Sequence, residues 1–233
     1  MNIAIILAGG IGSRMRSDGF PKQYIEVLDK PVLVYTLEKF EQSTDVNKIV
    51  IVANSLWHSQ IVEWLKKYRI SKFYDFALQG ESRQESILNG LKIAVECNAS
   101  DDDKVIIHDS VRPLVSQELI SKCFKELDDH DGCMPVITVN DTIYFSNNGK
   151  TITELLDRSK LYAGQSPESF NLKKYFQINT SAGKTVLDNT KGSSEIAFNN
   201  GFDISLIPGD NMNFKLTTPE DLARFQVILK GEK

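Results

Sequence analysis

Short β-branched runs alternate with amphipathic stretches along the first part of the chain. The run at 3–7 leads into a glycine-rich segment, and a helix is predicted to begin at Val32, because Pro31 can stand at a helix start without losing a hydrogen bond. Further strands are predicted at 48–53, 73–78, 105–107 and 134–139, and further helices after Ser55, a possible N-cap, and at about 84–95 and 117–127. Because strands separated by helices need crossover connections, we expect an α/β fold with a doubly wound, mainly parallel sheet.

The alternation breaks at residue 141. Two β-prone stretches within 141–158 flank Ser-Asn-Asn-Gly at 146–149, which favours a hairpin with Asn-Gly at its tip. We expect this hairpin to project as an arm, at about 140–160, from a single domain covering 1–233. Beyond it we expect a polar, weakly structured stretch to about residue 192, a short helix at 194–199, a strand at 203–206 and a C-terminal helix opened by Thr218, Pro219 and Asp221.

Composition is ordinary for a globular protein of 233 residues, with 41% hydrophobic and 25% charged residues. The net charge of −4 disfavours a general polyanion binder, so we expect no nucleic-acid partner. The longest apolar stretch is far shorter than the roughly 20 residues that a membrane-spanning helix needs, and no basic segment precedes it as in a signal peptide. We expect a cytoplasmic protein with no membrane partner. Three cysteines without C-x-x-C spacing are expected to be reduced and mostly buried.

The glycine-rich segment after the first predicted strand is the first candidate binding site. Leu7, Ala8, Gly9 and Gly10 lie where open α/β sheets bind ligands, and glycines leave main-chain amides free to approach phosphate oxygens. Arg14 adds a positive charge. The spacing is neither G-x-G-x-x-G nor that of a P-loop, so a nicotinamide cofactor and a P-loop nucleotide site are disfavoured. For a glycine-rich turn taken alone, a tight connection without a ligand is the alternative.

Cations lie next to glycines or at the ends of predicted strands, although the protein is acidic overall. This placement suits a highly charged phosphate ligand better than DNA or a membrane. The cations concerned are Arg14, Lys22, Arg83, Arg158 and Lys215.

Asp109 follows the predicted strand at 105–107, at a position where carboxylates often meet a metal ion or a ribose. The alternative is a structural ion pair with Arg112, which is the role we expect for Arg112 itself. His108 is expected to be a near-core histidine with a satisfied hydrogen bond. Neither a G-x-S-x-G motif nor a marked catalytic cysteine appears, which disfavours covalent catalysis.

Seven segments in collinear order resemble the cytidylyltransferases that make CDP-linked polyols, a family whose members act on 2-C-methyl-D-erythritol 4-phosphate or on ribitol 5-phosphate. Several separate motifs in the right order are far more specific than any one of them. The segments are LAGGIGSRM at 7–15, PKQY at 21–24, GESRQESI at 80–87, HDSVRP at 108–113, DTI at 141–143, GQSPESF at 164–170 and NFKLTTPEDL at 213–222.

The resemblance implies a Rossmann-like nucleotidyltransferase fold, a homodimer in which the arm completes the partner subunit's site, and CTP and Mg²⁺ as ligands. It implies that Arg14 and Lys22 stabilise the transition state, that Arg158 and Lys215 orient the polyol phosphate, and that Asp109 lies near the magnesium ion. The residues it assigns to CTP are Leu7, Ala8, Gly9, Gly10, Gly80, Glu81, Ser82, Arg83, Gln84, Glu85, Ser86 and Ser110.

Within the family, Ser110, Gly164-Gln165 and Met212-Asn213 are similar to the ribitol type, which implies formation of CDP-ribitol and pyrophosphate for a cell-surface polysaccharide or teichoic acid. Residues 191–195 depart from the pattern, because Lys-Gly-Ser-Ser-Glu stands where the family usually has Thr-Asp and small residues. The close alternative is the erythritol enzyme of isoprenoid synthesis. An alternative of another class is a nucleotide-binding protein without catalysis, which a full set of transition-state cations argues against.

Overall fold

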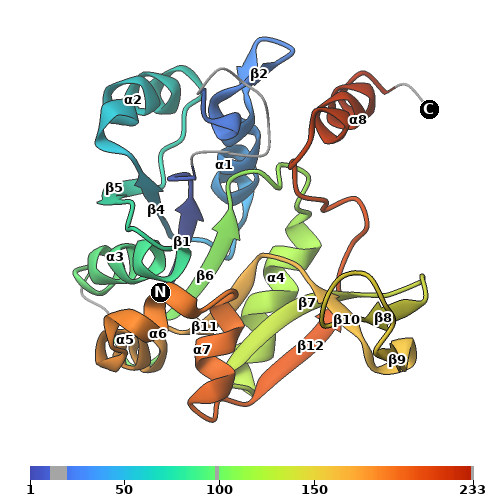
Figure 1. Ribbon diagram of the computed structural model, residues 1–233. Coiled ribbons are helices and arrows are strands. Elements are labelled where there is room, and N and C mark those ends of the chain that lie inside the picture. Colours follow the sequence, from blue (N-terminus) through green and yellow to red (C-terminus); the bar gives the residue numbers. More distant parts are fainter. Residues whose placement is uncertain (11–19, 98–99, 232–233) are drawn as a thin grey trace.

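The computed structural model describes residues 1–10, 20–97 and 100–231, and a large β-sheet lies at its centre (Figure 1). The strands of this sheet are β1 (Asn2–Leu7), β4 (Lys48–Ala53), β5 (Phe73–Leu78), β6 (Lys104–Asp109), β7 (Gly132–Thr138), β10 (Tyr162–Gly164), β11 (Glu168–Asn171) and β12 (Ile204–Pro208). Their order is β10-β7-β11-β6-β1-β4-β5, and β12 pairs with β7.

Most neighbouring strands of the sheet run in the same direction. β1 pairs in parallel with β4 and β6, β4 with β5, and β7 with β12. Only β10 and β11, among the described strands of this sheet, run antiparallel to their neighbours. The prediction of a mainly parallel, doubly wound sheet is therefore confirmed.

Helices cover both faces of the sheet. The described helices are α1 (Val32–Gln42), α2 (His58–Lys67), α3 (Arg83–Val95), α4 (Gln117–Lys125), α5 (Leu172–Ser181), α6 (Lys184–Asn189), α7 (Ser193–Asn199) and α8 (Pro219–Leu229). Short 3₁₀ turns lie at Lys22–Tyr24, Ser55–Trp57, Glu126–Asp128 and Arg158–Lys160, and a small hairpin joins β2 (Glu26–Val27) to β3 (Lys30–Pro31). None of the described helices is long and apolar enough to span a membrane.

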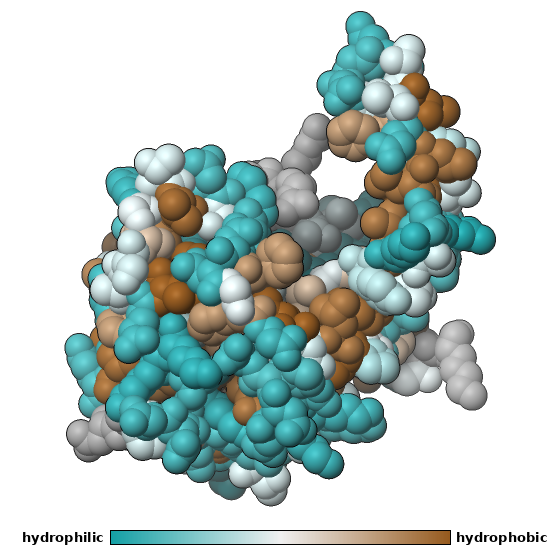
Figure 2. Space-filling model, turned by 90° about the horizontal axis from the view of Figure 1, so that it is seen from below, coloured by the Kyte–Doolittle hydropathy of each residue, from teal (hydrophilic) through white to brown (hydrophobic). Residues whose placement is uncertain are grey.

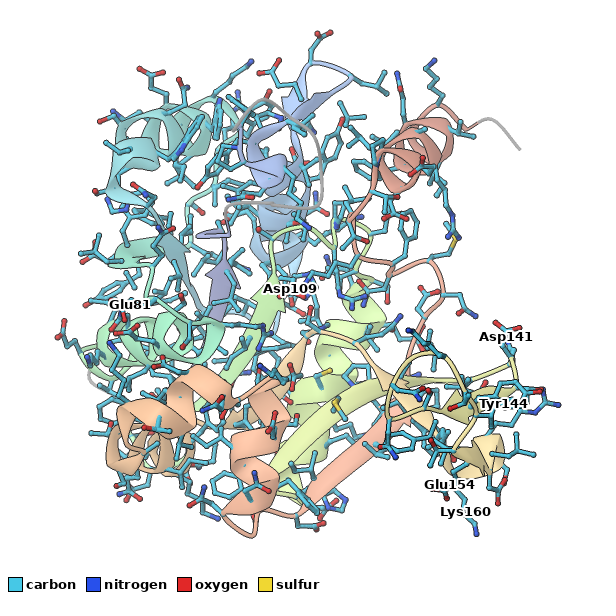
Figure 3. The ribbon with its side chains drawn as sticks, in the orientation of Figure 1. Glu81, Asp109, Asp141, Tyr144, Glu154 and Lys160 are labelled. Carbon is cyan, nitrogen blue, oxygen red and sulfur yellow. The ribbon has the colours of Figure 1, made fainter. Side chains whose placement is uncertain are left out.

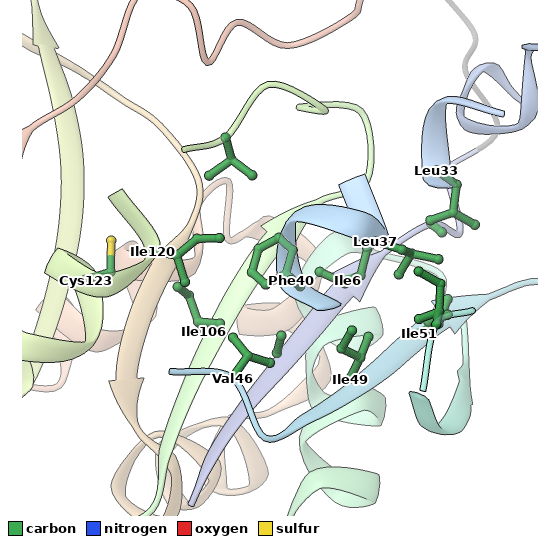
Figure 4. Packing of buried hydrophobic residues seen from close by; sticks show 14 of the residues in the cluster. Ile6, Leu33, Leu37, Phe40, Val46, Ile49, Ile51, Ile106, Ile120 and Cys123 are labelled. Carbon is green, nitrogen blue, oxygen red and sulfur yellow. The ribbon is translucent and has the colours of Figure 1, made fainter. Parts of the chain in front are cut away.

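Side-chain alternation along the strands divides the core into two layers. Ala4 and Ile6 of β1 pack with α1, α2 and α4, as Figure 4 shows for the residues around Phe40. Ile3 and Ile5 point to the opposite face and pack with α3, α5, α6 and α7. The free cysteines Cys97, Cys123 and Cys133 are all buried, as expected.

α3 packs closely on the sheet at Gly90. A Cβ atom at this position would lie 2.7 Å from Cγ2 of Ile5 and 3.1 Å from Cγ2 of Val52. Because both neighbours are fully buried, they have little room to move. Gly90 thus allows α3 to lie against β1 and β4.

The structure corrects two predictions. The stretch from 159 to 192 is not weakly structured, since it contains β10, β11, α5 and α6. β11 looks polar in sequence but lies between β6 and β7, where Ser169 Oγ donates a hydrogen bond of 2.6 Å to the Cys123 carbonyl. Ser55 is not an N-cap: Asn54 takes that role, accepting a hydrogen bond of 2.9 Å from the amide of Leu56.

The predicted hairpin arm is present as β8 (Ile143–Phe145) paired with β9 (Glu154–Leu156). Its connecting loop is longer than the predicted tip, and Asn148 Oδ1 accepts hydrogen bonds from the amides of Lys150 and Thr151 at 2.9 and 3.0 Å. The arm stands out from the body with hydrophobic residues on its surface (Figure 2). These exposed residues are Tyr144, Phe145, Ile152 and Leu155.

The C-terminal helix begins as predicted. Thr218 Oγ1 accepts a hydrogen bond from the Asp221 amide, and the Asp221 carboxylate accepts one from the Thr218 amide, which forms a capping box with Pro219 in the first turn. Phe225 of this helix is fully buried against Val32 and Leu216. This packing fixes the segment before α8, which carries Lys215, against the sheet domain.

Candidate active site

A cavity of about 530 Å³ lies at the carboxyl ends of β1 and β6, beside the beginning of α3. Figure 3 shows Asp109 at the end of β6 and Glu81 before α3. The residues from the sequence prediction that line this cavity are Leu7, Gly9, Gly10, Lys22, Gly80, Glu81, Ser82, Arg83, Ser86, Asp109, Ser110 and Lys215. Gln23, Val52, Gln79 and Val111 complete the wall. Arg14 lies outside the described residues.

Gln23, which was not predicted as a site residue, holds the first glycine loop in place by hydrogen bonds. The buried Gln23 donates hydrogen bonds of 2.6 and 2.9 Å to the carbonyls of Ala8 and Gly10. Ala8 is itself buried and does not line the cavity. A Cβ atom on Gly9 would lie only 2.6 Å from Gln79 Cβ, so this close approach requires glycine.

The loop before α3 is held by its own side chains. Ser86 Oγ accepts a hydrogen bond of 2.9 Å from the Gly80 amide, and the Glu85 carboxylate accepts one of 2.6 Å from the Glu81 amide. Ser82 caps α3 by accepting a hydrogen bond from the Glu85 amide. The positive end of the α3 dipole therefore borders the cavity, which favours a bound anion.

Gln84 and Glu85 do not line the cavity, although the sequence resemblance assigns them to CTP. Gln84 faces the core, where its amide nitrogen donates hydrogen bonds to Tyr175 Oη at 3.0 Å and to Asn179 Oδ1 at 2.5 Å. Its position one residue into α3 turns it away from the ligand side and toward α5. The Glu85 side chain is occupied with the Glu81 amide.

Asp109 is the centre of a cluster of cations on the cavity wall. Its carboxylate lies 2.9 Å from Lys215 Nζ, 3.5 Å from Arg83 Nη2 and 3.7 Å from Arg112 Nε. Burial alone would raise the pKa of Asp109, but Arg83, Lys215 and Arg112 outweigh it and hold that pKa well below its usual range. The expected pairing of Arg112 with Asp109 is confirmed, and Arg112 also donates to the Asn213 carbonyl at 2.6 Å.

The charge of Arg83 is stabilised in the same cluster. Burial would lower its pKa, but Asp109 and Glu168 outweigh burial and raise it. Arg83 therefore presents a positive charge at a fixed place on the cavity wall, which is the arrangement that a phosphate site needs.

The residues of this cluster fit a magnesium ion that is held mainly by substrate. Among the described residues, no group of three or more His, Cys, Asp or Glu side chains is placed to bind a metal ion. Mg²⁺ is commonly bound through one or two carboxylates together with phosphate oxygens. Asp109 is a carboxylate of the required kind at the wall of the cavity, so it can contribute to such a site but cannot form one alone.

A second cavity, of about 400 Å³, adjoins the first. Arg83, Asp109 and Lys215 line both. The other residues of the second cavity are Arg112, Met134, Gly164, Gln165, Ser166, Glu168, Lys191, Gly192, Ser194 and Glu195. The two cavities could therefore hold two ligands, one in each, that meet at Arg83, Asp109 and Lys215.

Glu168 and two serines hold Arg83 from the side of the second cavity, and none of the three is among the residues predicted from the sequence. Glu168 Oε2 accepts hydrogen bonds from the Ser194 amide and hydroxyl at 2.8 and 2.6 Å, and its other oxygen lies 3.7 Å from Arg83. Arg83 also donates to Ser193 Oγ at 2.6 Å. The segment Ser-Pro-Glu-Ser at 166–169 belongs to a motif recognised in the sequence, but the motif does not indicate that Glu168 contacts Ser194, 26 positions away.

Arg158 lies apart from both cavities. It follows β9 at the base of the arm and donates a hydrogen bond to the Asn140 carbonyl of the same arm. Figure 3 shows the arm residues Asp141, Tyr144 and Glu154 well to the side of Asp109. Within one chain, therefore, the structure gathers Lys22 and Lys215 but not Arg158.

Comparison with known proteins points to one family. Residues 2–231 match the sequence profile of 2-C-methyl-D-erythritol 4-phosphate cytidylyltransferase. The whole chain is 33% identical to ribitol-5-phosphate cytidylyltransferase of Vibrio parahaemolyticus serotype O3:K6, over 98% of that protein. It is 31% identical, over 98% of this chain and 95% of the relative, to the protein of the same name from Streptococcus agalactiae serotype III.

The fold also matches solved structures. The 4-diphosphocytidyl-2C-methyl-D-erythritol synthase of Anaerococcus prevotii superposes with a TM-score of 0.80 at 24% identity, covering 98% of this chain and 96% of that chain. At this identity the likeness supports the fold.

Proposed function

The chain belongs to the 2-C-methyl-D-erythritol 4-phosphate cytidylyltransferase family and is therefore a nucleotidyltransferase, and we propose that it makes CDP-ribitol from CTP and ribitol 5-phosphate. The observation that carries this proposal is the pair of adjoining cavities with Arg83, Asp109 and Lys215 between them. The larger cavity takes the nucleotide, because it is lined by the two glycine loops and the start of α3. The smaller cavity takes the phosphorylated acceptor.

In the proposed reaction, an oxygen of the acceptor phosphate attacks the α-phosphorus of CTP in line. A new phosphorus–oxygen bond forms, the bond to the β-phosphate breaks, and pyrophosphate leaves. No general base is needed, because a phosphomonoester with a second pKa near 6 is largely ionised at neutral pH. The barrier comes from bringing anions together and from the charge on the α-phosphoryl oxygens.

The residues of this chain supply positive charge at that point. Lys22 lines the nucleotide cavity beside Gly9 and Gly10, where it can stabilise charge on the transferring group. Lys215 lines both cavities and can hold the acceptor phosphate next to the α-phosphate. A magnesium ion bound with the triphosphate near Asp109 would neutralise phosphate charge further.

We propose ribitol 5-phosphate as the acceptor, rather than 2-C-methyl-D-erythritol 4-phosphate, for two reasons. Ser110, Gly164-Gln165 and Met212-Asn213 are similar to the ribitol type, and two ribitol-5-phosphate cytidylyltransferases are 31% and 33% identical along the chain. The proposal places the enzyme in the cytoplasm and its product in the synthesis of a cell-surface polysaccharide or teichoic acid.

The test is release of pyrophosphate from each of the four nucleoside triphosphates with a panel of polyol and sugar phosphates. We expect CTP with ribitol 5-phosphate to give the highest kcat/KM, since main-chain and polar side-chain groups of the loop at 80–86 are predicted to recognise the edge of a small pyrimidine. Turnover that is fastest with 2-C-methyl-D-erythritol 4-phosphate would instead support the isoprenoid enzyme. Nucleotide binding without pyrophosphate release from any pair would support the non-catalytic alternative.

The arm supports a further part of the proposal, namely that the enzyme is a homodimer in which Arg158 acts in the partner subunit's site. A two-stranded hairpin with exposed apolar side chains has too little core to be stable without a partner surface. In a symmetric dimer each arm would contact the other subunit, so each site would combine Lys22 of one chain with Arg158 of the other.

Mixing of inactive variants tests this arrangement. Arg158→Ala and Lys22→Ala chains should each be nearly inactive alone, but their heterodimer would contain one site with both native residues. After random subunit exchange, about a quarter of wild-type activity should return, because half of the dimers are mixed and each has one intact site. If exchange is verified and activity does not rise, Arg158 serves its own subunit.

A further inference from the structure

Lys191, Gly192, Ser194 and Glu195 line the proposed acceptor cavity, and they belong to the segment 191–195, which departs from the sequence pattern of the family that the chain resembles. Lys191 lies in the connection between α6 and α7, on the rim of the cavity. Its backbone is fixed, because its amide donates a hydrogen bond of 2.6 Å to Glu195 Oε2. The lysine is therefore held at a defined place beside the cavity.

The ammonium group of Lys191 differs from the other cations of this cavity. Arg83, Arg112 and Lys215 are each within 4 Å of the Asp109 carboxylate. Within the described part of the chain, no hydrogen bond or ion pair occupies the Lys191 ammonium group, and the Glu195 carboxylate is directed at the backbone of residue 191 instead. Lys191 is thus available to a ligand.

Charge balance gives this lysine a specific consequence. The residues lining the acceptor cavity include four cations, namely Arg83, Arg112, Lys191 and Lys215, and three acids, namely Asp109, Glu168 and Glu195. The formal excess of one positive charge depends on Lys191, since the cavity would be neutral without it. A phosphomonoester carries about −1.5 to −2 charges at pH 7 and is attracted to that excess.

We propose that Lys191 is an acceptor-binding residue of this cytidylyltransferase, whose ammonium group binds the phosphate of the acceptor together with Lys215. Both lysines line the same cavity of about 400 Å³, so a phosphate bound between them would contact both. The next residue, Gly192, has no atom within 4 Å of the position of a Cβ, so the lysine side chain has free space beside it. The inference rests on the proposed acceptor reaction, and it concerns the acceptor and not the nucleotide.

The test compares Lys191→Gln with wild type, with Lys191→Arg as the conservative variant and Lys66→Gln as the matched control. Lys66 is an exposed lysine on α2 and lines neither cavity. Binding of ribitol 5-phosphate and of 2-C-methyl-D-erythritol 4-phosphate is measured by calorimetry without CTP, and acceptor KM, CTP KM and kcat are measured separately.

Lys191→Gln should weaken acceptor binding and raise the acceptor KM by about tenfold, the effect of one charge-assisted contact. CTP KM and kcat should stay within about twofold, Lys191→Arg should retain most of the affinity, and Lys66→Gln should match wild type. The acceptor KM of Lys191→Gln should also depend less on salt than that of wild type, since one ionic contact is missing.

Unchanged acceptor affinity in Lys191→Gln would overturn the inference, and so would an equal loss of CTP affinity, because that would indicate a structural role. If wild type binds a polyol phosphate but releases no pyrophosphate, the proposed reaction fails while the Lys191 comparison still decides the inference. If wild type binds no polyol phosphate, the inference about Lys191 fails as well.

Discussion

The pH dependence of stability offers a quantitative test of the loop that carries Asp109. His108 ends up fully buried, with its ring 5.0 Å from that of Phe40 and with Nε2 donating a hydrogen bond of 3.1 Å to the Arg112 carbonyl. Nδ1 has no partner among the described residues, so the expectation of a satisfied histidine holds for one nitrogen only. A second proton would be placed on Nδ1, a buried donor without an acceptor. Burial therefore lowers the pKa of His108 to about 4.

The sign and size of the effect follow from linkage. In the unfolded chain the pKa of histidine is about 6.5, so between pH 6.5 and 4 the unfolded state binds a proton that the native state does not. The free energy of unfolding must then fall as the pH falls through this window. For a native pKa of about 4, the loss between pH 7 and pH 5 is about 2 kcal/mol. Asp109 does not contribute here, because its lowered pKa moves its effect to below about pH 4.

Urea denaturation at pH 7, 6 and 5 measures this loss in wild type and in His108→Gln, whose amide can still donate to the Arg112 carbonyl. We expect wild type to lose about 2 kcal/mol more than the variant between pH 7 and pH 5. His130→Gln is the control: a hydrogen bond from the half-buried His130 to Asp203 raises the pKa of His130, so removing this histidine should steepen the loss of unfolding free energy between pH 7 and pH 5. An equal loss in wild type and His108→Gln would refute the assignment to His108.

Two further predictions concern catalysis and packing. Lys22→Ala should lower kcat by a factor of about 10² to 10³ and change the affinity for CTP much less, because the proposed role of the Lys22 charge is to stabilise the transition state. Steady-state kinetics and calorimetry measure the two effects, and an equal loss of CTP affinity at unchanged kcat would exclude that role. Gly90→Ala should lower the free energy of unfolding by about 1 to 3 kcal/mol because the new methyl group would clash with Ile5, and a gain of up to about 1 kcal/mol in helix propensity would offset part of this loss. Lys92→Ala, on the exposed side of α3, should change the free energy of unfolding by less than about 0.5 kcal/mol. Equal changes in the two variants, measured by denaturant unfolding, would contradict the packing argument.

The first part of the fold was predictable because its patterns are local. β1, β4, β5 and β6 are short apolar runs, and the helices between them show the spacing of one buried face. β11 was missed because its sequence, Glu-Ser-Phe-Asn, looks like a loop. Its polar side chains can be buried because Ser169 donates a hydrogen bond to the Cys123 carbonyl and Glu168 accepts one from Ser194. No local sequence pattern reveals these contacts.

The site was predictable where a motif follows a strand. The two glycine loops and the segment after β6 each lie at the carboxyl end of a parallel strand, so the topology alone brings them to one edge of the sheet. Gln23 and Glu168 were not predicted, because their role is to hydrogen-bond the backbone of distant segments, at Ala8 and Ser194. Gln84 was assigned to CTP because the resemblance covers the whole segment 80–86, but its place on α3 turns its side chain to the core.

Asp109 explains how three cations can lie close together. Arg83, Arg112 and Lys215 come from three different segments and would repel one another at this distance, but a single carboxylate contacts all three. A bound phosphate offers the same kind of contact, so Arg83 and Lys215 can exchange one oxygen ligand for another with little movement. Because both residues line the two cavities, in the proposed reaction the same cations would contact the nucleotide on one side and the acceptor on the other. The carboxylate thus keeps the positive charge at the junction of the two cavities, where the two phosphates would meet in the proposed reaction.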